Sequence, residues 1–124
     1  MPGGDRAVRE PWRVALAALY AAGQPWDDDL PPLRHARGAN VELPAILHRQ
    51  METQLNSPPT SSMGRLFDAA AALAGVRQVV TYEAQAAIEF ETLVDRDEMA
   101  AYPFDYANGV IDPAPLWLDL LADR

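Results

Sequence analysis

Asp68 is the residue whose chemical type and surroundings most clearly indicate a binding function. It lies in an apolar stretch, residues 63–75, whose spacing is that of an amphipathic helix. Gly64 comes four residues earlier on the same helical face, and Ala71 and Ala72 keep the following turn small. A glycine inside a helix costs about 1 kcal/mol relative to alanine, so its place below a carboxylate suggests a shallow shelf. On such a shelf one carboxylate can accept hydrogen bonds from two vicinal hydroxyls, as when proteins bind a ribose.

The same residues also have a purely structural interpretation. Gly64 would allow a neighbouring helix to pack closely, and Asp68 would pair with Arg65 or another arginine at the surface. Spacing alone favours this second interpretation, in which the helices form a bundle that binds no ligand.

The other residues that could do chemistry are poorly arranged for it. The run Asp27–Asp29 offers oxygen ligands for a divalent cation, but consecutive carboxylates point apart, and a solvated loop is the favoured interpretation. His35 and His48 are thirteen positions apart, without the local pair that a zinc site needs. Nucleophilic catalysis by a serine is also poorly supported, because no histidine or lysine lies at a useful spacing from Ser57, Ser61 or Ser62. We therefore expect no catalytic and no metal-binding residue.

Composition excludes several classes of protein. A chain of 124 residues suits one domain or a piece of one. Its net charge of −8 repels phosphate backbones and argues against a nucleic-acid partner. The absence of cysteine rules out a disulfide scaffold, a thiolate metal site and a thiol nucleophile. No run approaches the ~20 apolar residues of a membrane span, and the first residues lack the pattern of a signal peptide. We expect a soluble, cytoplasmic chain without a membrane partner.

The apolar spacing predicts a mainly α fold of four to five short helices with one small β-hairpin. Five stretches have helical spacing, and they begin near Pro11, Pro44, Ser61 or Ser62, Thr81 and Asp112-Pro113. Three residues are expected to stop the first three helices: Gly23, Asn56 and Gly75. Alternation up to Tyr106, followed by Asn108-Gly109, predicts a hairpin with a primed turn. Residues 23–42 are expected to be irregular.

The spacing also predicts which side chains face the core. In the third helix these are Met63, Leu66, Phe67, Ala70, Leu73 and Ala74. In the fourth helix, where Glu83 would lie in the first turn, they are Ala87, Phe90, Leu93 and Val94. The last helix would bury Leu116, Trp117, Leu120 and Leu121.

Four segments in the same order resemble one enzyme family. TSSMGRLFDAAAALAG at Thr60–Gly75 closely resembles a signature of the HypF-type carbamoyltransferases, which mature NiFe hydrogenases. Three flanking segments fit the same family: PGGDRAVREPWRVAL at Pro2–Leu16, VTYEAQAAIEFETL at Val80–Leu93, and YPF…GVIDPAPL at Tyr102–Leu116. The resemblance covers nearly the whole chain.

The resemblance implies that residues 1–124 are a single helical fragment of a C-terminal Kae-like domain. That domain has the actin/Hsp70-type ATPase fold and is related to the TsaD tRNA-modifying proteins. The whole enzyme takes the carbamoyl group of carbamoyl phosphate, activates it with ATP as carbamoyl adenylate, and delivers it to the C-terminal cysteine of HypE. The acylphosphatase-like, zinc-finger and YrdC-like regions of the family are outside this chain, so we expect it to be inactive alone.

The resemblance also implies the site residues. Asp68 matches an aspartate that contacts the nucleotide ribose in the TsaD relatives, and Gly64 would make room for the nucleoside. Ala84 stands where the family usually has glycine, in a turn that approaches the nucleotide. The expected ligand is therefore ATP, and the expected protein partner is HypE. The isolated chain could also form a homodimer through surfaces that the missing lobes cover. The alternative is a free-standing acidic helical module that binds a protein partner without nucleotide.

Overall fold

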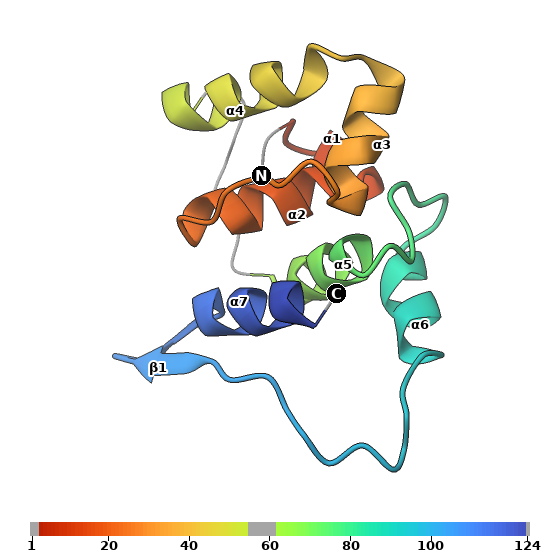
Figure 1. The fold of residues 1–124 in the computed structure, drawn as a ribbon, viewed down its shortest axis with the longest axis vertical. Helices are drawn as coiled ribbons and strands as arrows, with labels where there is room; N and C mark the ends of the chain where they lie inside the picture. Colours follow the sequence, from red (N-terminus) through yellow and green to blue (C-terminus); the bar gives the residue numbers. More distant parts are fainter. Residues whose placement is uncertain (1–2, 55–61, 124) are drawn as a thin grey trace.

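The computed structural model describes residues 3–54 and 62–123, and these form the expected mainly α fold (Figure 1). In chain order the elements are α1 (Arg6–Arg9), α2 (Pro11–Ala21), α3 (Pro31–Ala39), α4 (Leu43–Thr53), α5 (Met63–Leu73), α6 (Gln85–Glu91), β1 (Asp105–Ala107), β2 (Val110–Asp112) and α7 (Ala114–Ala122). None of the helices within these described ranges has the length and apolar character needed to cross a membrane.

The core forms where α2 packs against α5, the most extensive contact between two elements of the described structure. From α2, Trp12, Leu16 and Leu19 are at most 2% exposed. From α5 the buried residues are mostly alanines, Ala69 to Ala72, together with Leu73 and Asp68. Small side chains let the two backbones approach closely. The helices α3, α6 and α7 pack around this pair.

Helix α3 lies in residues 23–42, which the sequence was expected to leave irregular, so this prediction was wrong. Pro31 occupies the first turn, where a proline loses no hydrogen bond. Leu33 and Ala36 then follow at helical spacing and are buried against the core. With α1 added as well, the described residues contain seven helices instead of four to five. The prolines and the neighbouring acidic run are typical of loops, and for this reason the short amphipathic helix was not predicted.

Two predicted core faces are only partly right. In α5, Phe67 is 47% exposed and Met63 is 55% exposed, while Asp68, expected on an open shelf or at the surface, is buried. The fourth helix begins at Gln85, after Glu83, and ends at Glu91, so Leu93 and Val94 lie beyond it and are exposed. The real inward face of α5 is therefore rotated by about one residue toward its alanines.

The hairpin and the last helix are confirmed. Ala107 pairs with Val110 across Asn108-Gly109, and both turn residues have positive φ, as a primed turn requires. Helix α7 buries Trp117 and Leu120 as expected. Its start differs by one position, because Pro113 is the N-cap residue and the Asp112 carboxylate accepts a hydrogen bond from the Ala114 amide at 3.0 Å. Of the other predicted ends, Gly23 and Gly75 have left-handed backbone, whereas Asn56 lies outside the described residues.

The loop between α5 and α6 is fastened to the junction of α1 and α2. The Val80 amide donates to the Arg9 carbonyl at 2.9 Å, and the Trp12 amide donates to the Gln78 carbonyl at 3.3 Å. The Gln78 side chain also donates to the Ala72 carbonyl at 2.8 Å. Three backbone segments that are distant in sequence are thereby held together beside α5.

Shortening a core leucine tests the α2–α5 packing. Leu19→Ala removes a fully buried side chain and should lower the free energy of unfolding by about 2–5 kcal/mol. Leu118→Ala is the matched control, because this side chain is 49% exposed on α7 and its loss should cost less than about 1 kcal/mol. Urea unfolding followed by circular dichroism measures both, and equal costs would contradict the described core.

Candidate functional site

Asp68 forms a buried ion pair with Arg65 on the same helix. The two side chains are three residues apart on α5, and Nη2 of Arg65 lies 3.0 Å from Oδ2 of Asp68. The side chains are only 14% and 4% exposed, respectively. Nη1 of Arg65 also donates to the carbonyl oxygen of Val8 in α1 at 3.5 Å. One arginine thus connects the carboxylate to the helix that lies before α2.

Burial dominates the electrostatics of this carboxylate. Loss of solvent raises the pKa of Asp68 above its ordinary value, and the positive charge of Arg65 acts in the opposite direction. A raised carboxyl pKa favours the neutral form in the folded chain. Arg65 is therefore the group that favours the ionised form, which is the form that accepts hydrogen bonds with both oxygens.

The structural interpretation of Gly64 and its neighbours is right about the Arg65–Asp68 pair and wrong about Gly64, and the open shelf next to Asp68 is not formed. Gly64 is exposed, and a Cβ atom placed on it would meet only the Ser62 hydroxyl oxygen, at 3.5 Å, so none of the described helices packs against it. Ala71 and Ala72 are fully buried between helices and do not border an open shelf. Asp68 pairs with Arg65, as in the structural interpretation, but inside the protein instead of at its surface.

This burial corrects one expectation about Asp68. The sequence suggested that the side chain lies on a shallow, open shelf or at the surface. In the structure it is 3% exposed, and truncation would leave Arg65 without its carboxylate. A variant that removes the whole side chain therefore changes stability as well as binding capacity.

Ala84 has a backbone conformation that suits glycine. Its φ is +62°, in the left-handed region, and it is the residue immediately before α6. Glycine adopts this conformation freely, whereas a side chain with a Cβ atom is strained there. A glycine, which the sequence resemblance implies at this position, would adopt this conformation without strain.

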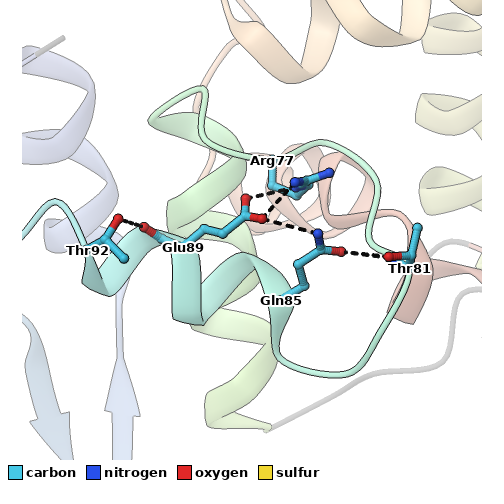
Figure 2. Close-up of polar contacts among 5 residues, drawn as sticks. All are labelled: Arg77, Thr81, Gln85, Glu89 and Thr92. Atoms are coloured by element: carbon cyan, nitrogen blue, oxygen red, sulfur yellow. Dashed lines mark hydrogen bonds and ion pairs between the residues drawn. The ribbon is translucent and has the colours of Figure 1, made fainter.

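A polar network of four side chains holds the start of α6 in place (Figure 2). Arg77 and Glu89 form a bidentate ion pair, with Nε–Oε2 at 2.9 Å and Nη2–Oε1 at 2.7 Å. Gln85, buried at the base of the helix, donates to Glu89 at 3.2 Å and accepts from the Thr81 amide at 2.8 Å. The loop before α6 and the helix itself are thus joined across the turn that contains Ala84.

Sequence reasoning missed this network, although a signal for it was present. Thr81, Gln85 and Glu89 are spaced by four residues, which places their side chains along one side of a helix and its first turn. Arg77 could not be assigned to them by spacing, because it precedes the helix and reaches it only through the fold of the loop. The hydrogen bond from Arg77 lowers the pKa of Glu89.

An apolar groove lies on the outer side of α5 and α6. It has a volume of about 510 Å³ and is lined by Phe67, Ala87, Ile88, Phe90, Glu91, Leu93 and Val94. Asp68, Gly64 and Ala84 do not line it, although Phe67 is the sequence neighbour of Asp68. The groove accounts for the predicted core residues that are exposed here.

The other candidates do not form a site. Asp28 pairs with Arg37 at 2.8 Å in an exposed position. His48 packs edge-on against Tyr20 and Trp26, whereas His35 lies beside Trp12. Within residues 3–54 and 62–123, no three His, Cys, Asp or Glu side chains are grouped so that they could hold a metal ion.

Comparison with known proteins shows both the class of domain and the family of this chain. All residues, 1–124, match the family model described as carbamoyltransferase, Kae1-like domain, second subdomain. The chain belongs to the HypF carbamoyltransferase family, as the sequence resemblance implied.

Individual relatives agree with this assignment. The chain is 48% identical over 120 residues to the carbamoyltransferase HypF of Rhizobium leguminosarum, with 97% of this chain and 15% of the relative covered. For HypF of Rhodobacter capsulatus the identity is 43%, with 97% and 15% covered. A crystal structure of full-length HypF in the phosphate- and nucleotide-bound form superposes with a TM-score of 0.76 at 30% identity, over 98% of this chain and 16% of that one. The chain thus spans about 15% of these curated relatives.

Restoring glycine at position 84 tests the strain in the turn. Ala84→Gly should raise the free energy of unfolding by about 1 kcal/mol, because the left-handed φ of +62° is unfavourable for alanine. Ala45→Gly is the matched control, since Ala45 is an exposed residue inside α4 and its replacement should cost about 0.5–1 kcal/mol. Thermal unfolding measures both, and a loss of stability in Ala84→Gly would contradict the strain.

The Arg77–Glu89 pair should make the stability of the fold depend on pH in the acidic range. A lowered pKa in the folded state contributes stability above the ordinary glutamate pKa, and this contribution is lost as the pH falls through the folded value. Glu89→Gln should therefore melt at a lower temperature than the parent near neutral pH, with the difference shrinking below roughly pH 4. Glu91→Gln, an exposed glutamate on the same helix, is the control. A constant difference at every pH would exclude a role for the charge.

Proposed function

We propose that this chain supplies the ribose side of the nucleotide cleft in a HypF carbamoyltransferase. The observation that supports it most is the buried Asp68 carboxylate, paired with Arg65 inside an alanine-rich helix at 3.0 Å. A carboxylate accepts hydrogen bonds from two vicinal hydroxyls, which is the arrangement that a ribose presents. The similarity to a full-length HypF crystallised in a phosphate- and nucleotide-bound form supports a nucleotide as the ligand.

In this proposal the other two residues complete the border of the site. Gly64, one turn before Asp68, leaves space at the surface where a nucleoside would lie, and Ala84 provides a sharp backbone turn at the start of α6. The Asp68 side chain is covered in the structure, so a ribose can reach it only if the cover opens as the nucleotide enters. The proposal requires this movement.

The reaction proposed for the whole enzyme is that of the HypF carbamoyltransferases. The carbamoyl group of carbamoyl phosphate is activated with ATP as carbamoyl adenylate and transferred to the C-terminal cysteine of HypE, in the cytoplasm. The relatives are far longer than this chain, which covers about 15% of them. We therefore assign to this chain nucleotide binding within the enzyme and no carbamoyl transfer of its own.

Titration of the full-length enzyme with ATP tests the ribose assignment. Asp68→Asn keeps the side-chain volume but removes the charged acceptor, so ATP affinity should fall at least about tenfold. Gly64→Leu should weaken ATP binding by filling the space beside Asp68, with little effect on folding, because that space is open. Isothermal calorimetry measures both affinities, with melting curves to confirm that each variant is folded.

Gly38→Leu is the matched control for the glycine variant. Gly38 is also an exposed helical glycine with open space around it, but it lies on α3. It should leave ATP affinity unchanged. If Asp68→Asn and Gly64→Leu also bound ATP normally, the ribose assignment would fail, and the module that binds a protein partner without nucleotide would become the better proposal.

A further inference from the structure

We propose that Arg65 is a positioning residue of the nucleotide site, which holds the Asp68 carboxylate in place for the ribose hydroxyls by bridging it to α1. This inference rests on the proposed function, because it assumes that Asp68 binds the ribose. It assigns a role in the nucleotide site to Arg65, which the sequence analysis considered only as a structural partner of Asp68. Arg65 acts through Asp68 and does not itself contact the nucleotide.

The first support is the burial of both partners. The Arg13–Glu10 pair is similarly covered, with side chains 6% and 17% exposed, although its carboxylate is less buried than Asp68. The Arg37–Asp28 side chains are 45% and 85% exposed, and those of Arg77–Glu89 are 37% and 33% exposed. In the Arg65–Asp68 pair the exposed fractions are 14% and 4%. Moving two charges out of water is unfavourable, and a pair of apolar residues would often be at least as stable. A pair that persists under this cost is better explained by a task of the carboxylate than by stability.

The second support is the fixed position of the guanidinium. Nη1 of Arg65 donates to the Val8 carbonyl in α1, while Nη2 approaches Oδ2 of Asp68. The planar guanidinium presents its donors in a fixed fork, so an anchor at one nitrogen also directs the other. The carboxylate is therefore oriented from a neighbouring helix and not only by its own rotamer.

The third support is the charge that Arg65 supplies. Burial raises the pKa of Asp68, which favours a neutral acid that would donate from one oxygen. Arg65 favours the ionised carboxylate, whose two oxygens both accept. A carboxylate also has about four lone-pair directions, so an arginine on Oδ2 leaves acceptor capacity for hydroxyl groups.

A double-mutant cycle in the full-length enzyme, read by ATP titration, tests this role. Arg65→Gln keeps a hydrogen-bond donor but loses the charge, and ATP affinity should fall about tenfold. The ATP affinity of Asp68→Asn should fall by a similar factor. Adding Arg65→Gln to Asp68→Asn should cause no further loss of affinity, because Arg65 acts only through the carboxylate. Arg65→Lys keeps the cation but lacks the planar fork that joins the Val8 carbonyl to Asp68, so ATP affinity should also fall, by about three- to tenfold. Arg49→Met on α4 controls for the loss of one exposed positive charge.

The outcomes separate this inference from the proposed function. If Asp68→Asn binds ATP normally, the ribose assignment itself fails. If Asp68→Asn weakens binding while folded Arg65→Gln binds normally, only the role of Arg65 is overturned. A further tenfold loss on adding Arg65→Gln to Asp68→Asn would also overturn it, because Arg65 would then contact the nucleotide directly. Should Arg65→Gln not fold, Arg65→Lys decides, since parental ATP affinity in that folded variant contradicts the proposal.

Discussion

The close contact between α2 and the alanine face of α5 is the constraint on which the rest of the structure depends. Ala69, Ala72 and Leu73 face the large side chains of α2, and their small size brings the helix backbones together. The next position on α5 before this alanine face holds Asp68, which is also buried. The burial of the carboxylate raises its pKa and makes its ionised form depend on Arg65.

Polar contacts fix the segments on either side of the α2–α5 pair. The loop after α5 is bonded to the end of α1 through the Val80 amide and the Arg9 carbonyl, and Arg65 reaches the same short helix at Val8. On the other side, the ion pair from Arg77 to Glu89 and the Gln85 side chain set the entry into α6. Asp68 and Ala84 therefore lie on elements that are positioned by one connected set of contacts, although sixteen residues separate them in the sequence.

Sequence patterns predicted the long helices and the turn well because the signals there are local. The spacing of apolar residues in α2 and α7 and the Asn108-Gly109 pair need no information from distant parts of the chain. The patterns failed where packing against an element distant in sequence decides whether a side chain is buried. Periodicity places Asp68 on a helical face, but only the folded structure shows that this face is covered, and Phe67 lines a groove on the outer side of α5 and α6. The family, by contrast, was recognisable from short segments, because a signature needs no knowledge of packing.

The hairpin has a consequence for how this chain behaves beside other molecules. Each strand has only three residues, and all of them are exposed, so both outer edges could offer free amides and carbonyls to a further strand. Asp105 and Asp112 face each other at its open end and place two negative charges there. An incoming strand would gain few hydrogen bonds and would meet repulsion from any acidic side chain of its own, since short, charged edges resist strand addition. The ribbon is thus protected against edge-to-edge aggregation by its brevity and charge, without a covering helix.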